Sequence, residues 1–238
     1  MSCEMPSQSR EPCAFCHSEE RSDEESGAKR LKNLAQGELR EGSQPLLIVL
    51  SGPSGVGKDK VLARMKGLGR SFHYVITATT RPQRAREKDG VDYYFLSQEK
   101  FQQMRDKGQF LEWAKVYGNY YGVPKDEISR ALSKGMDAIV KVDIQGAATI
   151  KEILPQAVFI FLVPPSMKEL ELRLKKRHSE SSTDLALRLE KAEEEIKSLP
   201  LFDYVITSHQ GKIDDIISRI DAIVIAEKCR VKPRVVEL

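Results

Sequence analysis

The sequence predicts an α/β fold in which a parallel sheet carries helices on both faces. Five short apolar runs alternate with helical patterns, and they lie at 46–50, 74–77, 138–143, 157–163 and 204–207. Near-continuous apolar strands separated by helices are typical of a parallel sheet that is buried on both faces. In addition, the first run leads directly into a glycine-rich turn and a helix start, which is the order of a βα unit.

Helix signals follow these strands in order. Two of the expected helices end at Gly108 and Gly135, because glycine commonly terminates a helix. Ser166 and Glu169 form a capping box, which marks the start of another helix. The full set of expected helices is 58–68, 98–107, 125–134, 145–153, 166–178, 183–198 and 214–228.

The turn after the first strand matches a phosphate-binding P-loop. Gly52, Gly57 and Lys58 stand at the spacing of that motif, between a strand and a helix. The backbone N–H groups of such a turn bind phosphate oxygens, and Lys58 adds a positive charge. The alternative is a glycine-rich βα turn that binds nothing. The residues expected to bind the nucleotide phosphates are Gly52, Pro53, Ser54, Gly55, Val56, Gly57, Lys58 and Asp59.

Asp59 departs from the P-loop motif, which has Ser or Thr after the lysine to hold Mg²⁺. A carboxylate can also ligate Mg²⁺, so we expect Asp59 to be a magnesium ligand. Its negative charge would then lie beside the phosphates. The alternative is that phosphates and water hold the ion.

Length, charge and hydropathy exclude several classes of protein. A chain of 238 residues makes one large domain, or a domain with an appendage. A net charge of +3 argues against a dedicated nucleic-acid binder. No apolar run reaches the length of a transmembrane helix, and the N-terminus lacks the apolar region of a signal peptide. Acidic residues near the N-terminus disfavour a transit peptide, so we expect a cytoplasmic protein, with an organellar stroma or matrix as the alternative.

Three of the four cysteines lie near the N-terminus. Cys13, Cys16 and His17 match a c-type haem attachment motif and also half of a zinc site. Haem attachment requires export, and a zinc site requires a second pair of ligands. The sequence shows neither an export signal nor a second pair of ligands nearby, so we expect free thiols in a reducing compartment.

The chain divides into three parts by composition. Residues 1–44 are polar and charged and lack periodicity, so they are predicted to form a disordered N-terminal extension. Residues 45–228 form the domain, and 229–238 a C-terminal tail. Within the domain, the segment 78–125 interrupts the alternation and is rich in Arg, Tyr and Gly, which indicates an insertion with a second binding site.

The chain contains five characteristic segments, in the order GPSGVGK; TTRPQR with EKDGVDYYF; FLEWAKVYGNYYG; VDIQGA; and FDYVI. Together they resemble the corresponding segments of guanylate kinases. The resemblance implies a P-loop kinase fold with a core of 45–77 and 126–228, a GMP-binding insertion at 78–125 and a helical lid at about 166–190. It implies transfer of the γ-phosphoryl group of ATP to GMP and dGMP, with Mg²⁺, in purine nucleotide metabolism. We expect a monomer or homodimer with no nucleic-acid or membrane partner.

The same resemblance assigns the acceptor site. Arg81 and Arg84 offer bidentate forks to a phosphate, and Tyr93 and Tyr121 add hydroxyl donors. Glu112 is expected to accept hydrogen bonds from N1–H and the N2 amino group of guanine. The GMP-binding residues implied are Thr77, Arg81, Arg84, Glu87, Tyr93, Glu112, Tyr121 and Asp143.

The lid supplies the remaining cations. In this family, lid arginines close over ATP and neutralise the charge of the transferring phosphoryl group. Arg177 and Arg188 match such positions and, with Lys58, are the expected catalytic residues, and Arg173 is a further candidate.

The sequence departs from the family pattern at several positions, among them Arg86, which replaces a usual Gly before Glu87, and the turn at 177–180. Val123 replaces a usual Ser or Thr, so a hydroxyl contact to GMP is missing and a raised KM is expected. Lys141 replaces a usual acidic residue, and we expect it to offset the charge of Asp59. Two alternatives also accompany the resemblance. A non-catalytic interaction module is disfavoured by the intact P-loop. A kinase for another nucleotide or phosphate ester is disfavoured by Glu112, which suits guanine.

Overall fold

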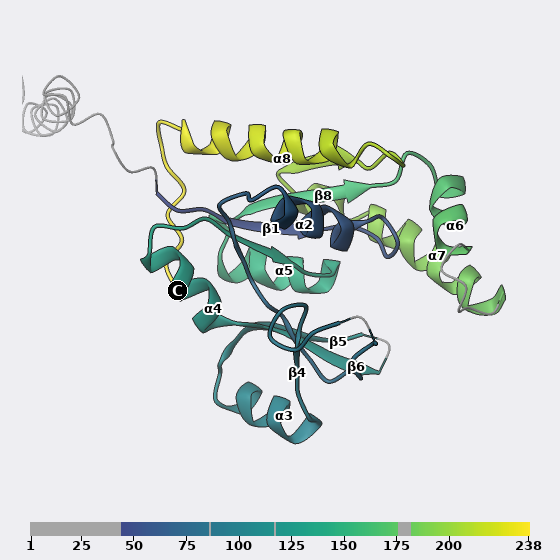
Figure 1. Ribbon diagram of the computed structural model, residues 1–238, viewed down its shortest axis with the longest axis horizontal. Helices are drawn as coiled ribbons and strands as arrows, with labels where there is room; N and C mark the ends of the chain where they lie inside the picture. The colour runs from purple at the N-terminus through teal and green to yellow at the C-terminus, as the bar shows by residue number, and fades with distance from the viewer. Residues whose placement is uncertain (1–43, 86, 117, 176–181) are drawn as a thin grey trace, which may run out of the picture. The chain divides into compact units, whose positions relative to one another are not determined.

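The computed structural model describes residues 44–238 apart from 86, 117 and 176–181 (Figure 1). The expectations for residues 1–43, including Cys13 and Cys16, lie outside the described residues. So does the site expected at Arg177.

A five-stranded parallel sheet forms the centre of the domain and confirms the predicted α/β fold (Figure 1). β1 is buried along its whole length and pairs with β7 on one side and with β8 on the other. The strand order is β2 (His73–Tyr74), β7 (Ala138–Lys141), β1 (Leu47–Ser51), β8 (Val158–Val163) and β9 (Tyr204–Thr207).

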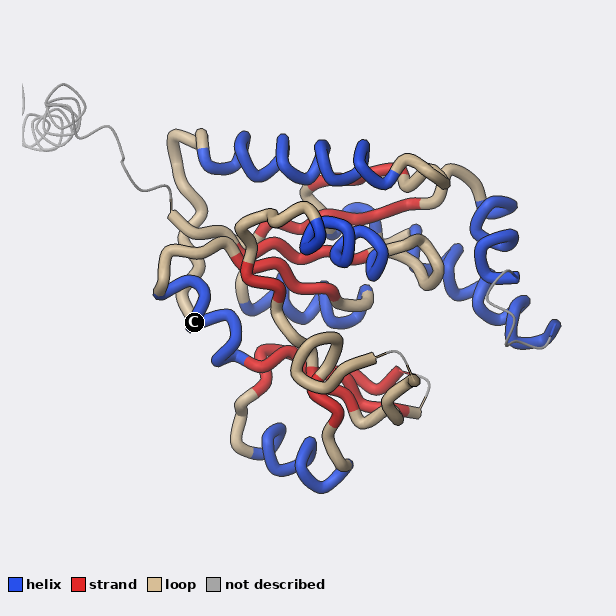
Figure 2. The backbone as a smooth tube through the Cα atoms, in the orientation of Figure 1, coloured by secondary structure: helices blue, strands red, loops and turns tan. Residues whose placement is uncertain are grey.

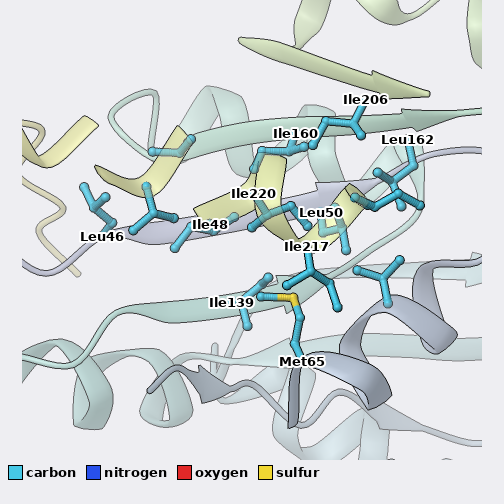
Figure 3. Close-up of a cluster of buried hydrophobic side chains, with 14 of the residues drawn as sticks. Leu46, Ile48, Leu50, Met65, Ile139, Ile160, Leu162, Ile206, Ile217 and Ile220 are labelled. Atoms are coloured by element: carbon cyan, nitrogen blue, oxygen red, sulfur yellow. The ribbon is translucent and has the colours of Figure 1, made fainter. Parts of the chain in front are cut away.

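Helices cover both faces of this sheet. The side chains of β1 alternate between the faces, so Ile48 and Leu50 pack against α2 (Lys58–Gly67) and α8 (Ile213–Lys228) (Figure 3). Leu47 and Val49 point the other way, toward the cluster that includes α4 (Lys125–Ser133) and α5 (Ile144–Ile153). Burial of these apolar residues, at about 25 cal/mol per Å² of apolar surface, is the main term that stabilises the layers.

Two of the predicted strands are shorter than expected. The run 74–77 forms only β2, which ends at Tyr74 as the chain leaves for the insertion. The run 138–143 ends at Lys141, because Asp143 serves as the N-cap of α5 and accepts a hydrogen bond from the N–H of Gly146 at 2.9 Å. This cap fixes the strand end that carries Lys141 and Asp143.

The insertion forms a second, four-stranded sheet with one helix, α3 (Gln98–Asp106) (Figure 2). Phe101 of the helix stacks on Phe110 and Tyr120, with ring centroids 4.5 and 5.4 Å apart. An insertion was expected here from the sequence, but its strands were not. Their order in the sheet is β4 (Tyr94–Phe95), β3 (Ala78–Thr79), β6 (Asn119–Pro124) and β5 (Phe110–Val116).

Two further helices follow β8. α6 (Met167–Lys175) and α7 (Ser182–Ile196) pack through Leu170, Leu174 and Ala192. As the capping box predicts, the Ser166 hydroxyl accepts a hydrogen bond from the N–H of Glu169, at 3.2 Å. A single 3₁₀ turn (Leu199–Leu201) then leads to β9.

The C-terminal residues return to the sheet. Arg234 donates hydrogen bonds to the Glu227 carboxylate at 2.8 Å and to the carbonyl of Ala157 at 2.9 Å, and it lies 3.4 Å from Asp203. Glu227 is fully buried, so Arg234 supplies the charge that its carboxylate requires.

Candidate active site

The P-loop has the backbone that its glycines predict. Gly52, Gly55 and Gly57 all have positive φ, at 144°, 85° and 113°, which favours glycine. A Cβ atom at Gly52 would lie 2.3 Å from the carbonyl oxygen of Leu162, so no other residue fits there without a backbone shift. The loop therefore depends on glycine for both conformation and space.

Lys58 begins α2 and bends back over this loop. Its ammonium group donates hydrogen bonds to the carbonyl oxygens of Gly52 and, at 3.3 Å, Pro53. Burial lowers the pKa of Lys58 to about 8, although Asp59 and Glu195 act in the opposite direction. A buried cation beside a glycine-rich turn at a helix N-terminus is poised to pair with an anion.

The P-loop and the insertion border one cavity of about 240 Å³. Residues from both sequence-predicted sites meet in it. Its lining is Gly52, Ser54, Lys58, Asp59, Thr77, Tyr93, Glu112, Ala114, Val116, Tyr121, Lys141, Val142, Asp143, Lys191 and Glu195.

Glu112 of β5 lies in this cavity and is only 5 % exposed. Its Oε2 atom is buried and has no hydrogen-bond partner among the described residues. Burial, and then the charge of Asp143, raises the pKa of Glu112 to about 8. An unpartnered buried carboxyl group costs stability, and a ligand with N–H donors would satisfy it.

The tyrosines of the cavity connect it to Arg81. The Arg81 guanidinium lies 5.2 Å from the centroid of the Tyr93 ring, and Tyr93 and Tyr121 pack edge to face with centroids 6.2 Å apart. The two terminal nitrogens of the Arg81 guanidinium, Nη1 and Nη2, donate to the Glu87 carboxylate, each at 2.9 Å. Arg84 lies farther out, with its side chain 74 % exposed and 3.8 Å from Glu87. Neither arginine lines the cavity itself.

Lys141 and Asp59 form an ion pair at the edge of the cavity. The Lys141 ammonium donates to Asp59 Oδ1 at 2.5 Å and to the Tyr93 hydroxyl at 2.8 Å. The expected pairing of the two residues is therefore confirmed. No cluster of three His, Cys, Asp or Glu side chains that could hold a metal ion occurs within the described part of the chain.

A second cavity, of about 310 Å³, lies against another part of the P-loop. Val61, Ile213 and Ile216 give it apolar walls, and Arg173 crosses it to donate hydrogen bonds to the carbonyls of Val56, at 3.1 Å, and Ser208, at 2.5 Å. Apolar walls with a few polar groups are typical of a small-molecule site.

Comparison with known proteins identifies the family. The family model described as guanylate kinase matches residues 44–227. The chain belongs to the guanylate kinase family. It is 45 % identical to a guanylate kinase of Caldanaerobacter subterraneus over 79 % of this chain and 90 % of that protein. It is 44 % identical to the chloroplastic/mitochondrial guanylate kinase 2 of Oryza sativa, over 82 % and 69 % of the two chains.

The fold agrees with that of a solved guanylate kinase, from Anaplasma phagocytophilum. The TM-score is 0.65 at 34 % identity, and the match covers 80 % of this chain and 89 % of that one. The P-loop kinase fold that the sequence predicts is thus the fold of a solved family member.

Helix α7 contributes two cavity residues that were not predicted from the sequence. Lys191 and Glu195 of α7 line the cavity, and Glu195 accepts a hydrogen bond from the backbone N–H of Ser54. Burial raises the pKa of Glu195, while Lys58 lowers it. Arg188, which was predicted, lies on the same helix but is not a cavity residue. Its spacing of three and seven to Lys191 and Glu195 is the signal that would have identified both, because such residues share one helix face.

Val123 also departs from the guanylate kinase pattern. It is fully buried and lies directly opposite Glu112 in the β5–β6 register. Directly opposite residues of an antiparallel pair lie on the same face of the sheet. A methyl group of Val123 therefore lies on the same face as Glu112, at the position where the usual Ser or Thr of the family pattern would place a hydroxyl group.

Proposed function

We propose that this chain transfers the γ-phosphoryl group of ATP to GMP, giving ADP and GDP. The observation that carries the proposal is that one cavity is lined by both Lys58 of the P-loop and Glu112, whose buried Oε2 atom has no hydrogen-bond partner among the described residues. A phosphate-binding turn and a base-binding carboxylate at one cavity suit a reaction between two nucleotides.

In this proposal Glu112 recognises guanine. The carboxylate accepts hydrogen bonds from N1–H and from the N2 amino group, which satisfies the buried oxygen that lacks a partner. Adenine presents an acceptor at the corresponding edge, which a carboxylate would repel. Thr77 and Asp143 line the same cavity and would contact the base.

The acceptor phosphate would bind beside Tyr93 and Tyr121, whose hydroxyl groups can donate to it. Glu87 holds Arg81 next to these rings. A phosphate could therefore replace Glu87 as the acceptor of one Arg81 hydrogen bond without a large movement of the side chain. Arg84 would reach the same phosphate from its exposed position.

The donor would bind to the P-loop. Its phosphates would accept hydrogen bonds from the loop N–H groups and from the Lys58 ammonium. Its base would bind in the second cavity, next to Arg173. Mg²⁺ would enter with ATP, held by phosphate oxygens and water. Asp59 is already paired with the ammonium of Lys141, and the residues that the structure describes form no cluster of carboxylates that could cage the ion.

The reaction breaks the bond between the γ-phosphorus and the β–γ bridging oxygen, and forms a bond from that phosphorus to a GMP phosphate oxygen. The total charge of the nucleotides is the same before and after, so no general base is required. Catalysis rests on positioning and on charge stabilisation, for which Lys58, Arg188 and Arg177 are the proposed cations.

A coupled assay of ADP release with GMP, dGMP, AMP, CMP and UMP tests the proposal. GMP should be preferred, with dGMP also accepted. Glu112→Gln should lower kcat/KM for GMP roughly 5- to 150-fold, because leaving a buried donor poorly paired costs about 1–3 kcal/mol. Affinity for ATP should stay within about twofold. Equal rates with AMP and GMP would contradict the proposal.

We also propose a cytoplasmic location and a role in purine nucleotide metabolism. No helix among the described residues has the length and apolar character needed to span a membrane. The Oryza sativa relative is named chloroplastic/mitochondrial, so an organelle is the alternative. Imaging the full chain fused at its C-terminus to a fluorescent protein distinguishes the two.

A further inference from the structure

Lys141 occupies a position between the two halves of the cavity. It is the last residue of β7 and lies beside Leu50 of β1, at the strand ends from which the P-loop departs. Asp59, one of its partners, belongs to the first turn of α2, while Tyr93, the other, belongs to the insertion. The ammonium of Lys141 thus joins the donor side to the acceptor side.

The hydrogen bonds of Lys141 leave capacity for a ligand. An ammonium group has three N–H donors, and the described residues accept from two of them. The side chain is 19 % exposed and lines the cavity. Burial opposes the charge, but Asp59 and Tyr93 outweigh it, so the pKa of Lys141 is raised and the group stays protonated.

A purely structural ion pair of the same kind occurs elsewhere in the chain. Lys151 lies 2.9 Å from Asp203 and 4.3 Å from the centroid of the Phe159 ring. Lys141 similarly lies 4.7 Å from the centroid of the Tyr93 ring. The difference is that Lys141 borders the cavity together with Lys58, whereas Lys151 borders neither cavity.

We propose that Lys141 is a catalytic residue whose ammonium binds the phosphoryl group as it passes from donor to acceptor, and that Asp59 is its positioning residue. The inference rests on the proposed function. Both residues depart from the P-loop kinase pattern, so an ion pair takes the place of a metal-binding hydroxyl and its acidic partner. The fixed positive charge stabilises the negative charge that is spread over the oxygens of the phosphoryl group.

The test compares Lys141→Met, Asp59→Asn, the double variant and the matched control Lys151→Met. Lys141→Met should lower kcat roughly 100-fold, as does loss of one donor to a developing charge in other enzymes. The dissociation constants of GMP alone and of a non-hydrolysable ATP analogue alone, measured by calorimetry, should change less than about fivefold. Lys151→Met should leave kcat within about twofold.

Asp59→Asn should lower kcat by about tenfold, and the double variant should be no slower than Lys141→Met, because Asp59 acts through Lys141. The dependence of analogue binding on Mg²⁺ concentration should be unchanged by Asp59→Asn. Additive losses, or a changed Mg²⁺ dependence, would instead make Asp59 a magnesium ligand and overturn its positioning role.

Two other outcomes separate this inference from the proposed function. If the unmutated protein phosphorylates GMP and Lys141→Met keeps its kcat within threefold, the role of Lys141 is refuted and the function stands. If the unmutated protein does not use GMP, both fail together.

Discussion

Gly146 of α5 lies directly against the carboxyl group of Glu112 in β5. A Cβ atom built at Gly146 would be 2.8 Å from Glu112 Oε2 and 2.9 Å from its Cδ. The absence of a side chain at Gly146 therefore sets the position of the carboxyl group that we assign to guanine. Gly146 is also the residue whose N–H is capped by Asp143, so one helix start fixes both acidic residues.

Gly146→Ala should weaken GMP binding. The added methyl group must displace Glu112, and such overpacking costs about 1–3 kcal/mol, which corresponds to roughly a 5- to 150-fold higher dissociation constant. Calorimetry with GMP and with an ATP analogue gives the comparison. Gly67→Ala, at a helical glycine whose Cβ would meet nothing within 4 Å, is the control and should leave GMP binding unchanged.

GMP binding near pH 7 should release a proton. With a pKa raised to about 8, Glu112 is mostly protonated in the empty site, and the donors of guanine favour the ionised form. Calorimetry in buffers of different ionisation enthalpy counts the protons, and up to about one should be released per GMP bound. The release should vanish in Glu112→Gln, and its persistence there would assign the proton to another group.

Glu112→Gln should stabilise the empty protein increasingly between about pH 5 and pH 8. The folded pKa of about 8 lies above the usual value of 4.5. The carboxyl group therefore costs least below pH 4.5, and the folded state loses stability progressively as the pH rises from 4.5 to about 8, above which the loss levels off. Melting temperatures of both proteins at pH 5, 6.5 and 8 show whether the gap widens. A constant gap would contradict the assigned burial.

Binding of an ATP analogue near pH 8 should take up protons, whereas binding of GMP should release them. Burial lowers the pKa of Lys58 to about 8 in the empty protein, and phosphate oxygens would raise it again. The complex should consequently take up a fraction of a proton, and Lys58→Met should abolish both that uptake and most of the binding. Proton release in the unmutated protein would contradict the role of Lys58.

Val123→Thr should lower KM for GMP. The substitution places a hydroxyl group opposite Glu112, where it can donate to the carboxylate or to the nucleotide. One added hydrogen bond contributes about 0.5–1.5 kcal/mol, so KM should fall roughly 2- to 10-fold. Steady-state kinetics at saturating ATP provide the measurement. Unchanged KM would mean that this face of Glu112 does not contact GMP.

The parts of the fold that follow local patterns were predictable from the sequence. The strand at Leu47–Ser51 and the helix at Lys58–Gly67 follow from an apolar run and a glycine-rich turn. Strands β3 and β4 of the second sheet were not predictable, because each is two residues long and cannot show a period-2 pattern. Such short strands are defined by their partners rather than by their own residues.

The candidate site divides in the same way. Motif spacing identified Lys58, and resemblance identified Glu112 and Tyr93. The contact of Gly146 with Glu112 joins positions that are 34 residues apart, and no local pattern encodes it. The pairing of Asp59 with Lys141 was predictable only because both depart from the motif in charge, in opposite directions.

The end of the family match does not coincide with the end of the folded unit. The match stops at residue 227, yet the guanidinium that neutralises the buried carboxylate of Glu227 belongs to Arg234. A gene fragment trimmed at the match would encode that anion without its cation, and its product would have to protonate Glu227 or expose it. The family match thus marks the residues that relatives share, whereas the pairing of Glu227 with Arg234 shows that residues beyond the match also belong to the folded domain.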